Sequence, residues 1–238
     1  MPLGTEVGGS ATWPGSTVPV RVDVWNSGGS SLSGDVALSV PDGWSATPAA
    51  RSFGPLATGR SQTLTFDVTV PAGVKPGEYH VDATATSGEV EVNGTGTVQV
   101  LGDTIEFSPG TSAEDPWLSE DGGSQLDGPV DEGGRGRFTD NERFFVYKFE
   151  LPADVTGGTL SVKIGNEFHV EASTDGSNWT TVLHEDREIR DQSNYGWRDL
   201  DLNALRGSGR TVYLRFSDSF TSDGWGGWLG RTKLVLQR

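Results

Sequence analysis

The chain has no cysteine, and this absence excludes several kinds of chemistry. Its 238 residues include no Cys and a single Met, so disulfides, thiol nucleophiles and thiolate-ligated metals are ruled out. No apolar run reaches the roughly 18 residues that a membrane-spanning helix needs. The first residues lack the charged and apolar regions of a secretory signal, so we expect any exported form to be part of a longer precursor.

Long helices and a basic surface are missing as well. No window shows a sustained apolar period of about 3.6 residues, whereas 34 glycines, 12 prolines and many short Val/Thr-rich runs predict an all-β fold. The formal net charge of −15 comes from 33 acidic and 18 basic residues. Such a charge repels nucleic acids and anionic membranes, and we expect neither as a partner. An acidic surface suits a polyhydroxyl ligand or a cation.

The first half of the chain reads as a series of short strands. Apolar and polar residues alternate over 18–24, 64–70 and 79–85, and turn clusters rich in Gly, Pro, Asn and Asp separate these segments. About seven such strands in about 100 residues predict an immunoglobulin-like sandwich over residues 1–101.

Three short motifs in this half suggest a family. Val24-Trp25-Asn26-Ser27-Gly28, Pro41-Asp42-Gly43-Trp44 and the segment from Pro71 to Tyr79 follow in order. This part resembles the immunoglobulin-like domain found beside carbohydrate-binding modules in alpha-galactosidases and other large bacterial glycosidases. The resemblance covers roughly residues 5–101 and implies a spacer without catalytic residues.

The second half, residues 102–238, contains eight strand patterns, and the boundary is expected at Leu101–Asp103. The patterns cover Thr104–Phe107, Phe144–Leu151, Thr159–Gly165, Phe168–Ser173, Thr180–His184, Trp197–Leu202, Thr211–Ser217 and Lys233–Gln237. Asp175-Gly176 supplies a tight hairpin turn, and Trp179 begins the return strand. We expect a jelly roll of two packed sheets.

The strand, the Ser-Thr-Asp-Gly turn and Trp179 resemble the middle of discoidin-like, or galactose-binding-like, β-sandwiches. The resemblance covers nearly all of residues 103–238. It implies a ligand site, usually for sugars, in loops at one end of the sandwich, and a structural calcium ion near the first loops.

An irregular acidic stretch over residues 108–142 is the expected place for that calcium. It holds nine carboxylates and two arginines, and calcium prefers carboxylate and carbonyl oxygens. The spacing does not match an EF-hand, so no ligand set can be derived. Asp121, Asp140 and Glu142 are the candidate ligands, and a solvated surface charge is the alternative for each.

The expected sugar site is the segment Asp218–Trp228, which we predict to be a loop. It combines Asp218, Asp223, Trp225 and Trp228 with three glycines. Aromatic faces stack on pyranose rings, and carboxylates bind hydroxyls. The alternative is that Trp228 only closes the end of the core.

A second loop, residues 186–197, adds Arg190, Asn194 and Tyr195 as binding candidates. Arg and Asn beside an aromatic ring also suit hydroxyl recognition. The alternative is a solvated loop whose Trp197 packs inward.

No pattern indicates catalysis. His80, His169 and His184 lack zinc spacing, and no nucleophile elbow or phosphate-binding loop is present. We therefore predict a non-catalytic carbohydrate-binding region of a larger, secreted, extracellular bacterial glycoside hydrolase. Its partners would be a polysaccharide or glycan and the catalytic domain of the same polypeptide, and we expect a monomer. The alternative is a pair of structural domains that space or brace that catalytic domain.

Overall fold

The structure, a computed structural model, describes residues 3–126 and 136–238. Strands make up 59% of it and helix 2%, so the all-β prediction is confirmed. The chain divides into two compact units, unit 1 (Met1–Gly102) and unit 2 (Asp103–Arg238). Within the described ranges no helix is long and apolar enough to cross a membrane.

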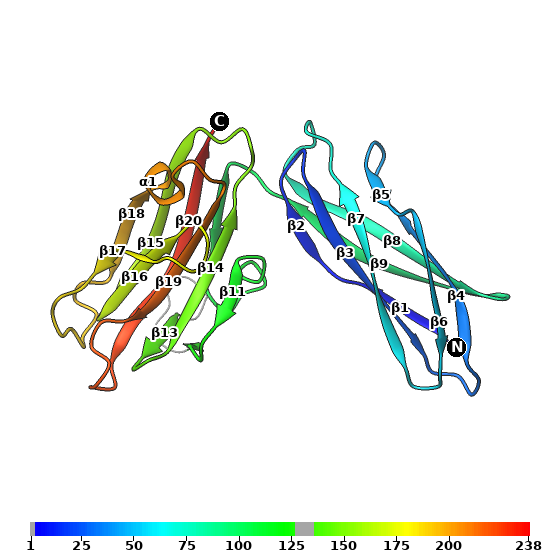
Figure 1. Ribbon diagram of the computed structural model, residues 1–238, viewed down its shortest axis with the longest axis horizontal. Coiled ribbons are helices and arrows are strands. Elements are labelled where there is room, and N and C mark those ends of the chain that lie inside the picture. Colours follow the sequence, from blue (N-terminus) through cyan, green and yellow to red (C-terminus); the bar gives the residue numbers. More distant parts are fainter. Residues whose placement is uncertain (1–2, 127–135) are drawn as a thin grey trace. The chain divides into compact units, whose positions relative to one another are not determined.

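Unit 1 consists of two sheets packed face to face (Figure 1). One sheet has the order β1-β3-β7-β5, formed by Leu3–Val7, Thr17–Asn26, Ser61–Thr69 and Ser45–Thr47. The other has the order β2-β9-β8-β4-β6, formed by Ser10–Thr12, Val90–Val100, Gly77–Ser87, Leu32–Ser39 and Ala50–Leu56. All pairs are antiparallel except the short parallel contact of β2 with β9.

The core of unit 1 follows from the period-two pattern of its strands. In β3 every second residue is buried, so Val18, Val20, Val22 and Val24 point inward while polar neighbours face solvent. The neighbouring strand β7 follows the same pattern and buries Leu64, Phe66 and Val68. Trp44 is buried against this core, whereas Trp25 remains 38% exposed.

Unit 2 is also built from two sheets, all of whose strands pair antiparallel. One has the order β12-β13-β20-β15-β18, with β10 also paired to β20; these strands are Gln125–Leu126, Arg137–Asp140, Gly226–Gln237, Gly157–Gly165, Gly196–Asp201 and Thr104–Phe107. The other has the order β11-β14-β19-β16-β17, formed by Leu118–Asp121, Phe144–Glu150, Thr211–Asp218, Phe168–Ser173 and Thr180–His184. A short helix, α1 (Leu202–Arg206), follows β18.

Aromatic rings fill the space between these two sheets. Phe145 and Phe216 stack with ring centroids 4.7 Å apart, and Tyr147 meets Phe216 edge-on at 5.6 Å. Such pairs add to the free energy of burial. The first and last strands of unit 2 close the fold, since Leu236 N donates to Asp103 O and Arg238 Nε lies 2.6 Å from Asp103 Oδ1.

Two expectations about irregular segments were wrong. The stretch 108–142 contains the short strands β11, β12 and β13, and the strand expected to begin at Lys233 begins at Gly226. Glycine is usually disfavoured in strands, but here the missing Cβ atoms are needed. A Cβ on Gly226 would lie 1.7 Å from the carbonyl oxygen of Thr139 in the paired strand. The predicted loop Asp218–Trp228 therefore shrinks to residues 219–225.

Candidate functional site

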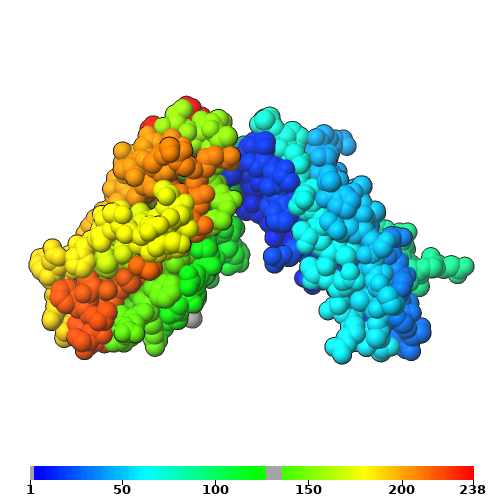
Figure 2. All heavy atoms as spheres, in the orientation of Figure 1, coloured from blue at the N-terminus to red at the C-terminus, as the bar shows by residue number. Residues whose placement is uncertain are grey.

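Two loops at one end of unit 2 lie against each other, and together they form the candidate site. We call residues 185–195, between β17 and β18, and residues 219–225, between β19 and β20, the rim loops. Arg190 Nη2 donates to Asp223 Oδ2 at 2.6 Å, and Ser219 Oγ donates to the carbonyl of Glu185 at 2.9 Å. The structure thus joins candidates from both loops. In Figure 2 the red-orange atoms of one loop lie beside the yellow atoms of the other.

The conformation of the second rim loop presents Trp225 to solvent. Asp223 Oδ1 accepts a hydrogen bond from Trp225 N at 3.0 Å, which is the Asx-turn that an aspartate two residues upstream provides. Gly224 between them has a φ of +79°, a value that favours glycine. The indole that follows is 42% exposed. An aromatic ring, a carboxylate and a guanidinium are therefore held within one short segment of surface.

A buried carboxylate, Glu167, lies beneath the rim loops. Its side chain has no solvent exposure, and its Oε1 accepts a hydrogen bond from Ile189 N at 2.9 Å. Its Oε2 has no hydrogen-bond partner among the described residues. Burial, and then the charge of Asp223, raise the pKa of Glu167. Sequence reasoning missed this residue, because a glutamate in the two-residue turn between β15 and β16 is expected to face water.

The rim has more negative than positive groups around its arginine. Arg190 Nη2 lies 3.1 Å from Glu188 Oε2, in addition to its pairing with Asp223, and its Nε lies 3.9 Å from Glu167 Oε1. Three carboxylates therefore share one guanidinium. Glu167 is buried, so the exposed Glu188 and the partly exposed Asp223 offer the acceptors for the hydroxyl groups of a ligand, and the guanidinium offers donors for a ligand oxygen.

Asp218 is part of the framework below the rim. Its side chain is 5% exposed, and its two oxygens accept hydrogen bonds from Phe220 N at 2.8 Å and Asn141 N at 3.1 Å. Burial is the main reason that its pKa rises to about 6. This carboxyl group fixes the start of the second rim loop to the turn before β14, and both of its oxygens are engaged by the backbone.

Asn194 and Tyr195 also hold structure together. Asn194 exchanges two hydrogen bonds with the backbone of Asn166, at 2.7 and 3.0 Å. The ring of Tyr195 lies over two glycines of the sheet, and a Cβ on Gly230 would be 1.7 Å from its hydroxyl oxygen. Lys163 Nζ is 5.2 Å from the centroid of the same ring.

The two remaining tryptophans of this region differ from the expectations. Trp228 belongs to β20, is partly exposed, and meets Phe138 edge-on with ring centroids 5.9 Å apart. It does not lie in a loop. Trp197 is 41% exposed at the start of β18, so the alternative in which it packs inward is wrong.

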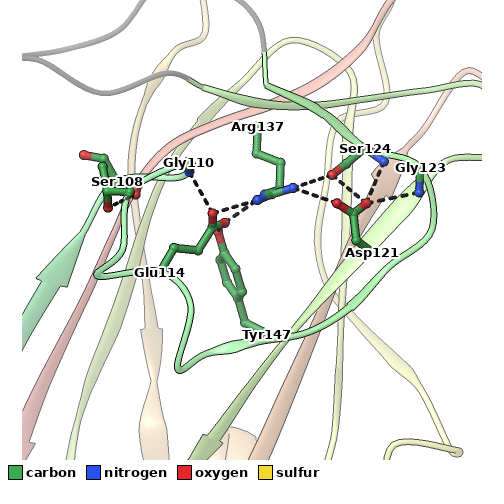
Figure 3. Close-up of polar contacts among 9 residues, drawn as sticks. Ser108, Gly110, Glu114, Asp121, Gly123, Ser124, Arg137 and Tyr147 are labelled. Carbon is green, nitrogen blue, oxygen red and sulfur yellow. Dashed lines mark hydrogen bonds and ion pairs between the residues drawn. The ribbon is translucent and has the colours of Figure 1, made fainter. Parts of the chain in front are cut away.

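A buried polar network occupies the start of unit 2 and includes one calcium candidate (Figure 3). Arg137 Nε and Nη2 donate to the two oxygens of Glu114 at 2.8 and 2.6 Å, and the Tyr147 hydroxyl donates to the same carboxylate. Arg137 Nη1 pairs with Asp121 Oδ2 at 2.9 Å. The other oxygen of Asp121 accepts hydrogen bonds from the turn formed by Gly123 and Ser124. Asp121 therefore already has a full set of partners.

The other calcium candidates do not converge with Asp121. Asp140 Oδ1 lies 2.9 Å from Arg143 Nη1, and Glu142 is exposed in the turn between β13 and β14. The described residues contain no group of three or more His, Asp or Glu side chains that could hold a metal ion. Three carboxylates of the acidic stretch, Asp127, Asp131 and Glu132, lie outside the described residues. The calcium ion stays a prediction, which a change of the melting temperature in EDTA would test.

Comparison with known proteins identifies a domain in unit 1. Residues 12–88 match the family described as NPCBM-associated, NEW3 domain of alpha-galactosidase. The resemblance predicted for this part of the chain is confirmed. The resemblance of residues 102–238 to discoidin-like modules stays a prediction. No curated protein matches the chain.

Solved structures give only distant likenesses. A family 123 glycoside hydrolase from Clostridium perfringens has 15% identity and a TM-score of 0.29 over 43% of this chain and 27% of its own length. The CBM51-2 and INT domains of Clostridium perfringens ZmpB have 12% identity and a TM-score of 0.34 over 68% and 38%. Red sea bream transglutaminase has 13% identity and a TM-score of 0.34 over 100% and 32%. Likenesses at these TM-scores support no statement about function.

Proposed function

We propose that this chain is a non-catalytic, carbohydrate-binding accessory region of a larger secreted bacterial glycoside hydrolase. Unit 1 acts as the spacer, and the rim loops of unit 2 bind a polysaccharide or glycan outside the cell. Weak binding then raises the local concentration of substrate at a catalytic domain of the same polypeptide. The chain acts as a monomer.

The match to a domain of alpha-galactosidase supports the assignment to a glycosidase. The proposal for unit 2 rests on one observation, which is that Trp225, whose indole is 42% exposed, is hydrogen-bonded through its backbone N to the Asp223 carboxylate that also pairs with Arg190. An exposed indole offers a stacking surface for the C–H face of a sugar. The charged pair beside it offers donors and acceptors for the hydroxyl groups of the same ring.

Affinity gel electrophoresis and a glycan array test this proposal. The intact chain is expected to be retained by at least one sugar polymer, and Trp225→Ala is expected to abolish that retention. Trp25→Ala is the matched control, because Trp25 is a similarly exposed indole in unit 1, at 38%. Retention that survives in Trp225→Ala, or that disappears equally in Trp25→Ala, would contradict the proposed site.

The alternative, two domains that only brace a catalytic neighbour, gives a different result in the same experiment. In that case no polymer retains the chain. Protection of Trp225 from solvent would then occur only in a longer polypeptide that includes the catalytic domain. Fluorescence quenching of the tryptophans in both forms distinguishes the two functions.

A further inference from the structure

Two of the three histidines of the chain face each other across one hairpin of unit 2. His169 in β16 is directly opposite His184 in the edge strand β17, and their ring centroids are 5.0 Å apart. Both lie on the solvent side of the sheet, because the neighbouring Phe168 and Val170 are buried in the core. The proposed sugar site does not use this pair.

A bulge in the hairpin creates this arrangement. Glu171 is opposite Thr181, and continuing that register would place His169 opposite Leu183. The register shifts by one residue between Val170 and Glu171 and moves His184 into place. The next pair along, Phe168 and Glu185, is hydrogen-bonded through Glu185 N and Phe168 O at 3.0 Å. His169 and His184 therefore form a non-hydrogen-bonded pair, in which cross-strand side chains come closer.

The surroundings leave both imidazoles able to act as ligands. His184 Nε2 lies 3.2 Å from Asp186 Oδ1, and His169 Nε2 lies 3.0 Å from Thr181 Oγ1. When Nε2 donates its proton to such an acceptor, Nδ1 keeps the free lone pair. A carboxylate or hydroxyl behind a ligating histidine is the usual way in which proteins set the tautomer of a metal ligand.

The charges around the pair also favour a cation. Glu171 and Arg215, which follow on the same face, neutralise each other in an ion pair. Asp186 adds a negative charge, and the whole chain carries −15. Neutral imidazole is a ligand for late first-row metals such as copper, nickel and zinc.

We propose that His169 and His184 form a two-histidine site for a late first-row divalent metal ion on the outer face of the β16–β17 hairpin. Water completes the coordination, in keeping with the absence of any group of three metal-ligating side chains in the described part of the chain. A bound ion would cross-link the edge strand β17 to β16, immediately before the first rim loop.

Copper titration of the intact, untagged chain tests the site. We expect saturable binding of one Cu²⁺ that involves both imidazoles, and an EPR spectrum with hyperfine structure from two equivalent nitrogen ligands. His169→Gln and His184→Gln should each remove one of these nitrogens and weaken binding by at least about tenfold. His80→Gln is the matched control, because it replaces the only other histidine, in unit 1.

A second measurement keeps the outcome interpretable if a histidine variant folds poorly. Asp186→Asn changes an exposed side chain and leaves both imidazoles, so it should fold normally and weaken binding by about tenfold. Zn²⁺ should raise the melting temperature of the wild type and not that of the double variant His169→Gln/His184→Gln. Unchanged copper binding in the double variant, or binding only at the terminal amine, would overturn the proposal.

Discussion

The guanidinium of Arg190 donates a hydrogen bond of 2.6 Å to the carboxylate of Asp223, which is 33 residues further along the chain. This contact connects two loops that the sequence predicted separately as candidates for sugar binding. It also fixes the carboxylate that starts the turn before Trp225. The proposed sugar site therefore depends on one ion pair that both loops share.

We expect Arg190→Gln and Asp223→Asn to weaken glycan retention by tenfold or more while leaving the melting temperature almost unchanged. The pair is open to solvent on the side of Arg190, whose side chain is 44% exposed against 14% for Asp223. Such a pair contributes little to folding, but its loss releases the two loops from each other. Affinity gel electrophoresis and thermal unfolding measure the two effects. Arg187→Gln is the control, because Arg187 is in the same loop and pairs with Glu185 of that loop. Equal losses in all three variants would show that the pair has no special role.

The stability of unit 2 is expected to fall as the pH rises through the titration of Asp218. Its pKa is about 6 in the folded chain against 3.8 for an ordinary aspartate. The folded state therefore binds more protons between these values, so ionisation of this group lowers the free energy of unfolding as pH increases. The loss is on the order of 3 kcal/mol and is complete above about pH 7.

Asp218→Asn isolates this contribution from the other carboxylates. The amide does not ionise, so any cost of its altered hydrogen bonds should not depend on pH. Urea unfolding of both proteins between pH 4 and 7.5 should show the free energy of unfolding of the variant increasing relative to that of the wild type as the pH rises. A constant difference across this range would contradict the assigned pKa.

Single substitutions in the Glu114–Arg137 pair should be strongly destabilising. Their side chains are only 2% and 5% exposed, so removal of one partner leaves a buried charge without compensation. Arg137→Met is expected to cost about 3–5 kcal/mol. The double variant Glu114→Gln/Arg137→Met should be more stable than Arg137→Met alone. Chemical denaturation of the wild type, Glu114→Gln, Arg137→Met and the double variant measures the coupling energy between the two side chains. Losses of stability that simply add would contradict the predicted coupling.

Gly230 is expected to tolerate no side chain while Tyr195 is present. An added Cβ would overlap the Tyr195 hydroxyl, so Gly230→Ala should destabilise unit 2 by about 1–3 kcal/mol. Tyr195→Phe should partly restore stability to this variant, because it removes the overlapping oxygen. In the wild-type background Tyr195→Phe should stabilise slightly, since that buried hydroxyl has no hydrogen-bond partner among the described residues. Thermal unfolding distinguishes these outcomes.

The sequence predicted strands well where one face is buried and the other is solvated. The alternation in β3 and β7 and the Asp175-Gly176 turn of the β16–β17 hairpin all follow from local chemistry, and Gly176 has the expected positive φ of 74°. Strands β11–β13 were missed because they have no alternation of apolar and polar residues. The residues of β11 and β12 are mostly exposed, and β13 buries the polar side chains of Arg137 and Thr139.

The candidate site was only partly accessible from sequence. Trp225, Asp223 and Arg190 were nominated because their residue types suit sugar recognition. The contact between their loops and the burial of Glu167 depend on how distant segments pack. The same holds for the histidine pair, since a register shift that no local motif indicates sets His184 opposite His169.

Strand β20 has a consequence for how unit 2 can be attached to other domains. Its 12 residues run from the β19–β20 loop to Gln237, a length of about 40 Å. The residues by which the chain enters and leaves unit 2, Asp103 and Arg238, are hydrogen-bonded to each other at its far end. The first and last residues of unit 2 therefore lie together at the pole of the sandwich opposite the rim loops, and a fusion at either of them begins at that pole.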